Sequence, residues 1–400
     1  MPLLNIQDPP QKQPFSLFVL AFRPFFLAAG IFSVIGMLMW VAVLNLGLSI
    51  PMNGLSPYQW HAHEMIYGFT LAVVSGFLLT AIKNWTGVQT LQNRKLMSLL
   101  AFWALARVSM MFGSSGLLFA AVMDLSFNLL LFYGTLQPIL QVKQWKQIGI
   151  VSKILLLSIT NLLFYLGALG FLDQGIEWSL IGGVFLLLAL VMTLGRRVMP
   201  MFIQNGAGYP VQLKNSVFLD RTSLILFLLL ALTELFIHHV YLSSTLATGL
   251  VIVSVLRLHN WHTPGIWRSS LVWGLYVAFI FITLGFLIYA LKPYFPVFNR
   301  SIAIHTFTFG GIALITISMM SRVTLGHTGR DILKPSRLIG LAQGFIVAGT
   351  IIRVLPPMIS PEWYLQWIFI SQTLWIAAFS LFVWVNLPLL TQPRIDGASG

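Results

Sequence analysis

The chain has 400 residues, of which 58% are hydrophobic and only 8% are charged, and its formal net charge is +13. Because soluble proteins carry roughly 25% charged residues, this composition excludes a soluble protein. The chain has no cysteine, which excludes disulfides, thiolate-bound zinc, iron–sulfur clusters and covalently attached c-type haem.

Apolar runs long enough to cross a bilayer recur along the whole sequence. They predict an all-α membrane protein with about twelve transmembrane helices in a single polytopic domain, residues 1–400. Short polar tails are predicted at 1–20 and 391–400. The predicted spans lie near 25–46, 62–82, 96–113, 115–138, 148–171, 178–199, 221–240, 241–258, 270–291, 302–322, 336–355 and 363–390.

Basic residues are distributed unevenly between the two sets of loops. Eighteen of the 23 lysines and arginines fall in the tails and in loops after even-numbered spans, whereas three fall in loops after odd-numbered spans. Because basic loops stay in the cytoplasm, both termini are predicted to be cytoplasmic. The positive charge is thus explained by orientation in membrane lipid, and no nucleic-acid partner is expected.

The stretch Tyr58–Gly68 places three polar groups, His61, His63 and Glu64, where the second span begins. Ionisable groups in a membrane helix are costly and usually mark a function. Positions i and i+2 differ by about 200° on a helix, so the two histidines are predicted to face different neighbours. Glu64 follows His61 by three residues and is a candidate to orient that ring or to bind a metal. The alternative is a set of interfacial hydrogen-bonding groups.

The predicted orientation puts five of the eight histidines on the periplasmic side, and these form the candidate metal cluster. Imidazole is a good ligand for haem iron and for copper. Glu234 is predicted to share a helix face with His238, although a solvated helix end explains the His238–His239 pair equally well. The five histidines are His61, His63, His238, His239 and His305.

An internal similarity relates two of these histidines at an offset of 242 residues. His63 precedes Tyr67 and Gly68 as His305 precedes Phe309 and Gly310. This spacing indicates either chance or an old parallel repeat with two equivalent, facing histidines. The glycines after each histidine would leave room for a flat macrocycle, or they serve ordinary helix packing.

Other charged groups lie inside or at the ends of spans. Arg107 and Asp124 are predicted at similar depth on adjacent helices, where they form a structural ion pair or line a polar path. Arg197, Arg322 and His327 lie at the cytoplasmic ends of their spans. They are interpreted as topological anchors or as a binding site for an anion such as a haem propionate.

At these residues the chain resembles the NnrS family of bacterial inner-membrane proteins. The resemblance covers most of the chain and implies about twelve spans, bound haem and copper, a multi-pass location in the bacterial inner membrane and a role in the nitric oxide response. It does not imply a particular reaction, so an oxidoreductase acting on nitric oxide remains one possibility. The matching motifs are Phe22–Phe26, Trp60–Met65, Gly76–Ala81, Asn84–Gly87, Gly195–Pro200 and His305–Arg330.

A remoter resemblance connects the chain with the catalytic subunits of haem-copper oxidases and nitric oxide reductases. Those proteins also use histidines on spans 2, 7 and 10. This chain departs from them in having an HxH pair on span 2, one histidine on span 10 and none on span 6. The departure argues against a complete oxygen-reducing site.

The sequence therefore predicts non-covalent haem b held by His61 or His63 together with His305. The remaining histidine, with Glu64, His238 or His239, is predicted to hold copper. Nitric oxide or a ligand derived from it is the expected small-molecule partner. Two alternatives stay open: a secondary or proton-coupled transporter that uses the same groups, and a metal-loaded sensor or scaffold without turnover.

Overall fold

The computed structural model describes residues 16–49 and 54–396, and the secondary structure in these residues is entirely helical. Most of the predicted N-terminal tail and the last residues of the C-terminal tail lie outside this range. The helices are α1 (Phe22–Leu46), α2 (Pro57–His63), η1 (Glu64–Thr70), α3 (Leu71–Thr86), α4 (Asn93–Ser109), α5 (Gly113–Gln141), η2 (Trp145–Gln147), α6 (Ile148–Ala168), α7 (Gly175–Gly206), α8 (Val217–Leu232), η3 (Thr233–Ile237), α9 (Val240–Trp261), η4 (Pro264–Arg268), α10 (Ser270–Leu291), α11 (Arg300–His305), η5 (Thr306–Ala313), α12 (Leu314–His327), α13 (Arg337–Val354), α14 (Pro356–Ile359), η6 (Pro361–Trp363) and α15 (Tyr364–Thr391).

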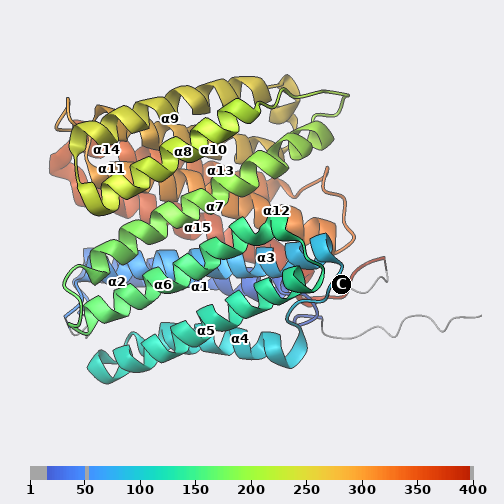
Figure 1. The fold of residues 1–400 in the computed structure, drawn as a ribbon, viewed down its shortest axis with the longest axis horizontal. Coiled ribbons are helices and arrows are strands. Elements are labelled where there is room, and N and C mark those ends of the chain that lie inside the picture. Colours follow the sequence, from blue (N-terminus) through green and yellow to red (C-terminus); the bar gives the residue numbers. More distant parts are fainter. Residues whose placement is uncertain (1–15, 50–53, 397–400) are drawn as a thin grey trace, which may run out of the picture.

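The long helices lie roughly side by side in one bundle (Figure 1). Within the described residues, ten helical segments are long and apolar enough to cross a membrane, which makes the chain a multi-pass membrane protein. Two further helices of the predicted set, α4 and α8, are shorter, with 17 and 16 residues. The predicted total of twelve spans depends on these two helices and stays a prediction.

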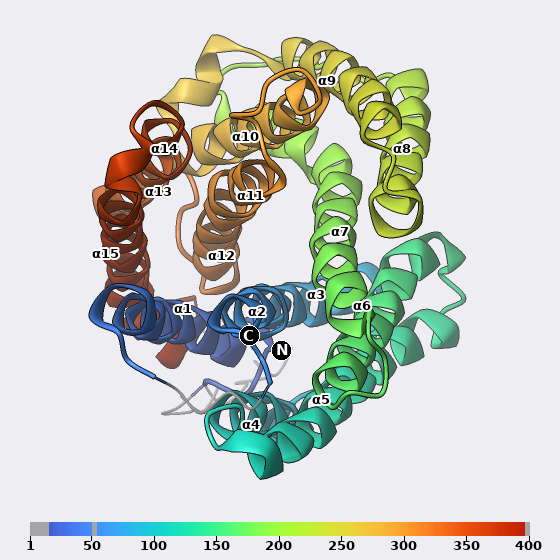
Figure 2. The ribbon, with the colours of Figure 1, turned by 90° about the vertical axis from the view of Figure 1, so that its left-hand side faces the viewer.

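The segments that carry His61, His63 and His305 are the most buried of the bundle. The apolar window of 57–86 is 83% buried and that of 300–327 is 78% buried, against 33% for α1. Viewed along the helices, α3, α7 and α12 surround the centre, and α4, α5, α8, α9 and α13–α15 lie outside them (Figure 2). His61, His63, Glu64 and His305 thus lie on well-buried helical segments.

The segment of the second span begins earlier than its hydropathy predicts. Ser56 and Gln59 form a capping box, in which Gln59 N–H donates to Ser56 Oγ at 3.2 Å and Ser56 N–H donates to Gln59 Oε1 at 2.8 Å. Pro57 fits the first helical position because it has no N–H to satisfy there. This cap starts the helix early enough to include His61 and His63.

A π-helical segment follows each of the two repeat-related histidines. η1 starts one residue after His63, and η5 starts one residue after His305. Helices α2–α3 and α11–α12 therefore share the same irregularity at the same offset of 242 residues. Since π-segments are rare in helices and often lie at functional sites, this coincidence supports a repeat rather than chance.

Orientation in the membrane gives a direct prediction. A reporter that is active only in the periplasm is expected to work when it is inserted between Lys292 and Arg300, because this loop joins two spans on the side poor in basic residues. The same reporter is expected to be silent when it is fused after Arg394. Measured activity in the opposite pattern would reverse the predicted orientation.

Candidate functional site

His63 lies at the centre of a buried polar network. Its side chain is fully buried, and its Nδ1 lies 3.1 Å from Glu64 Oε1. On the other side of the ring, Nε2 lies 2.9 Å from Asn161 Oδ1 of α6. Phe164 stacks on the ring at a centroid distance of 4.1 Å. Both nitrogens of His63 are thus occupied by hydrogen-bonding partners.

Arg107 joins the two carboxylates of this network. Its Nη1 donates to Glu64 Oε1 at 2.6 Å, and its Nη2 donates to Asp124 Oδ2. Tyr165 OH also donates to Asp124 Oδ2, at 2.7 Å. All four side chains are buried, so each charge depends on its partner for stabilisation. The predicted ion pair between Arg107 and Asp124 is confirmed.

His61 faces a different neighbour, as the helical angle predicts. Its ring stacks on Trp40 of α1, with ring centroids 4.4 Å apart and an interplanar angle of 7°. Its Nδ1 is buried and has no hydrogen-bond partner among the described residues. Buried polar atoms are nearly always paired, so this nitrogen is a candidate to bind a group other than the described residues.

The two ring nitrogens of His305 have different surroundings. Its Nδ1 lies 2.7 Å from the carbonyl oxygen of Ser301, which leaves Nε2 as the nitrogen with a lone pair. Arg353 Nη2 lies 3.4 Å from both ring nitrogens. His61 on α2 and His305 on α11 lie at the same end of the bundle, in the two halves of the predicted repeat (Figure 1).

Two expectations about the neighbours of these histidines are corrected. Glu64 contacts His63 and Arg107 instead of orienting His61, because its carboxylate is drawn to the buried guanidinium. Gly68 and Gly310 leave no room for a macrocycle. A Cβ atom at Gly68 would lie 2.8 Å from Phe32, and one at Gly310 would lie 2.5 Å from a phenylalanine of α10. These glycines serve helix packing.

The turn between α8 and α9, which carries His238 and His239, lies at the same end of the bundle as α2 and α11 (Figure 1). Both histidines are exposed. His238 ends η3 with a left-handed φ of 54°, and His239 caps α9 by accepting the Leu242 N–H at 3.2 Å. The buried Glu234 contacts Ser243 Oγ at 2.5 Å instead of a histidine. No group of three or more His, Asp or Glu side chains within the described residues is arranged to hold a metal.

The remaining predicted cofactor residues lie at the other end of the bundle. His327 ends the helical segment that begins near His305, about 33 Å away at 1.5 Å per residue. Its Nε2 lies 3.4 Å from Asn84 Nδ2. Arg197 donates to Gln147 Oε1 at 2.7 Å, and Arg322 lies over the Phe202 ring at 4.0 Å. These three residues are not brought together with His61 and His305.

Sequence reasoning missed three neighbours of the histidines: Trp40, Asn161 and Arg353. Arg353 had a usable signal, because it is one of only three basic residues predicted on its side of the membrane and it follows a long apolar run. Trp40 and Asn161 had none, since their contacts depend on how α1 and α6 pack against α2.

A comparison with protein families identifies this arrangement with a known group. The sequence profile described as "NnrS protein" matches residues 16–394, which is nearly the whole chain. A search of curated proteins finds no match. The family match agrees with the resemblance in the motifs and with the multi-pass helical structure. The chain belongs to the NnrS protein family.

Proposed function

We propose that this protein binds haem through His61 and His305 and acts in the nitric oxide response in the bacterial inner membrane. Membership of the NnrS family supports the role in the nitric oxide response. The observation that carries the haem proposal is that two imidazoles from separate inner helices lie at the same end of the bundle, and that the buried Nδ1 of His61 has no partner among the described residues.

The donor set fits haem, which His61 and His305 would hold through their imidazole nitrogens. Neutral imidazole nitrogens are standard haem ligands, and Ser301 fixes the tautomer of His305 by accepting a hydrogen bond from its Nδ1. Trp40 restricts the rotation of His61 by stacking on its ring. When bound, haem would supply an iron centre for electron transfer or for binding a diatomic ligand such as nitric oxide.

The chain's own charges set the surroundings of this centre. Arg353 is 8% exposed and lies beside His305, where its positive charge would stabilise an anionic group or added electron density nearby. The network of His63, Glu64 and Arg107 begins two residues after His61, at the junction of α2 and η1. Its ion pairs hold that helix in place and thereby position His61.

Copper binding stays a prediction that rests on the family resemblance. His63 would have to give up a hydrogen bond to bind copper, and the exposed His238 and His239 lie in a turn between α8 and α9. Metal analysis of the purified protein tests this part of the proposal independently of haem.

The haem proposal is tested by absorption spectroscopy of purified full-length protein. The wild type is expected to show a Soret band, and His305→Ala is expected to abolish or shift it, since the substitution removes the nitrogen aligned by Ser301. His259→Ala changes an exposed histidine at the other end of the bundle and is expected to leave the band unchanged. A colourless wild type from haem-replete cells, or an unaltered band in His305→Ala, would contradict the proposal.

The physiological part has its own readout. Cells that produce only His305→Ala are expected to be as sensitive to a nitric oxide donor as cells that lack the protein, whereas cells with His259→Ala are expected to grow like the wild type. Equal tolerance of the nitric oxide donor in all strains would contradict a role of the haem site in the nitric oxide response.

A further inference from the structure

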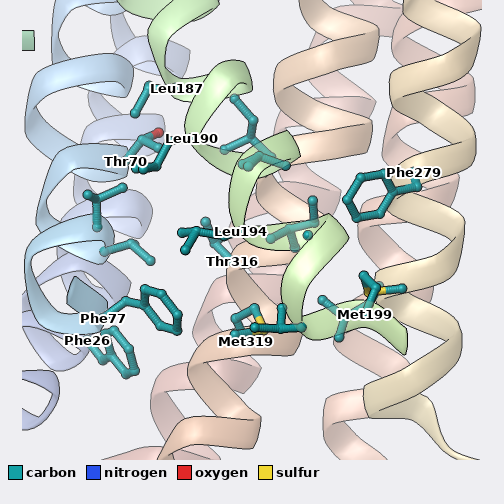
Figure 3. Close-up of a pocket in the computed structure, with 18 residues that line it drawn as sticks. Phe26, Thr70, Phe77, Leu187, Leu190, Leu194, Met199, Phe279, Thr316 and Met319 are labelled. Carbon is teal, nitrogen blue, oxygen red and sulfur yellow. The ribbon is translucent and has the colours of Figure 1, made fainter. Parts of the chain in front are cut away.

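A small apolar cavity lies inside the bundle, between α3, α7, α10 and α12 (Figure 3). Its volume is about 90 Å³. Among the described residues that line it, Thr70 and Thr316 are the only ones whose side chains carry a hydrogen-bond donor. Each hydroxyl donates to a carbonyl oxygen of its own helical segment, Thr70 to Met65 at 2.7 Å and Thr316 to Ala313 at 2.8 Å. Because these donors are already used, the cavity matches the apolar kind that stays dry.

The two segments related by the predicted repeat contribute equally to this lining. Four of the lining residues belong to η1 and α3, and four belong to η5 and α12. Each of the first four corresponds to one of the second four at the offset of 242 residues. A random packing defect would not select the same four positions from both segments, so the cavity lies where equivalent faces meet. The pairs are Thr70 and Ile312, Val73 and Ile315, Val74 and Thr316, and Phe77 and Met319.

The cavity lies on the same two helical segments as His61 and His305. Thr70 follows His61 by nine residues, and Ile312 follows His305 by seven. At 1.5 Å per residue these separations are about 10–14 Å along the helices, or two to three turns. The cavity is therefore deeper in the bundle than the two histidines and close to them along both segments.

Size and lining together limit what the cavity can hold. Small-molecule sites usually enclose about 300–1,000 Å³, so a lipid chain or a porphyrin is too large for about 90 Å³. An apolar cavity of about 150 Å³ binds benzene or xenon, and one water takes about 30 Å³ in the liquid. No charged side chain lines this cavity, which excludes anions because a buried charge needs a partner. The remaining class is a small, uncharged gas molecule.

We propose that this cavity holds nitric oxide as a dissolved, uncharged diatomic molecule within the bundle. Nitric oxide is only weakly polar, so moving it from water into a dry apolar space costs little hydration. The step is binding alone, and no covalent bond forms or breaks in it. The choice of nitric oxide rests on the proposed function, whereas the affinity for a small apolar molecule rests on the cavity itself.

Met199 and Met319 line the cavity and serve as reporters (Figure 3). Full-length protein in detergent micelles, isotopically labelled in the methionine methyl groups, is titrated with xenon under pressure and followed by NMR. The Met199 and Met319 signals are expected to shift and then saturate, because xenon fills a cavity of limited size. Met97 and Met201 are exposed, so their signals report xenon dissolved in the micelle and are expected to shift linearly. Single Met→Leu variants assign the four signals.

Nitric oxide is added to separate samples without xenon. Because nitric oxide is paramagnetic, its presence in the cavity is expected to broaden the methyl signals of Met199 and Met319. This broadening is expected to exceed that of Met97 and Met201, which contact only the gas dissolved in the micelle.

Variants that fill the cavity locate the binding site. Leu194 and Val73 line it from α7 and α3. Leu194→Trp and Val73→Phe are each expected to lose the saturable xenon shift and the additional broadening by nitric oxide. Leu224→Trp places a tryptophan at an exposed position of α8 and is expected to keep both. Melting temperatures check that each variant is folded.

Three results would overturn the proposal. They are a linear xenon response of Met199 and Met319 in the wild type, broadening by nitric oxide no stronger than that of Met97 and Met201, and responses retained in both filled variants. The haem proposal fails or holds by the Soret band of His305→Ala, whereas this one fails or holds by the methionine signals. The two failures are therefore distinguishable.

Discussion

Replacing Arg107 with methionine is expected to destabilise the protein by about 3–5 kcal/mol, because it leaves two buried carboxylates without their shared cation. Arg107 holds Glu64 at 2.6 Å and also donates to Asp124. Both carboxylates are buried to 99% or more. Unfolding of the purified protein in mixed micelles, followed by circular dichroism against increasing denaturing detergent, measures the loss.

Two further variants separate the ion pairs from side-chain packing. Arg94→Met removes an exposed arginine from the other end of the same helix and is expected to change stability by less than about 1 kcal/mol. A triple variant, Arg107→Met with Glu64→Gln and Asp124→Asn, neutralises the carboxylates and is expected to recover part of the stability. If Arg107→Met were as stable as Arg94→Met, the network would not hold these helices together.

The helices themselves could be predicted from hydropathy, because each apolar run has one solution in a bilayer, a hydrogen-bonded helix. The ends were less predictable. α7 was expected to end at 199 and continues to Gly206 through Pro200, since proline removes one backbone donor without forcing an end. The second span starts earlier than predicted because its first turn is polar and is stabilised by the Ser56 capping box.

The sequence predicted the directions in which the His61 and His63 side chains point, but not which residues contact them. The i and i+2 spacing correctly placed His61 and His63 against different helices. Contacts across the bundle decide which histidine has its ring nitrogens hydrogen-bonded by other residues. Asn161 of α6 contacts His63. Arg107 contacts Glu64, which therefore does not orient His61. The partners of His63 and Glu64 depend on how distant helices pack together, and the local sequence around these residues does not specify that packing.

The two segments related by the predicted repeat differ in charge, and the surroundings of their two histidines differ with it. At the offset of 242 residues, the position of Glu64 corresponds to Thr306 and that of Asp124 corresponds to Gln366. The acidic groups that surround His63 therefore have no counterpart around His305. His63 contacts a carboxylate and an amide, whereas the ring of His305 lies beside the Arg353 guanidinium.

Substitutions in the HxH pair are expected to separate these roles. His61→Ala is expected to abolish or shift the Soret band as strongly as His305→Ala, because it removes the imidazole whose buried Nδ1 lacks a partner. His63→Ala is expected to keep the position of the band and to lower stability by about 1–3 kcal/mol, because it leaves the buried Asn161 Oδ1 without the His63 ring and removes one of the contacts of Glu64.

The comparison is made on protein purified from haem-replete cells, with the spectrum normalised to protein and with unfolding measured on the same samples. His63→Gln serves as a matched variant, because its amide can still hydrogen-bond Asn161 or Glu64 but is a poor iron ligand. We expect His63→Gln to retain the band and more stability than His63→Ala. A band lost in both His63 variants and kept in His61→Ala would make His63 the partner of His305. That result would also mean that haem binding displaces Glu64 and Asn161 from the ring, so the network seen here would belong to the haem-free protein.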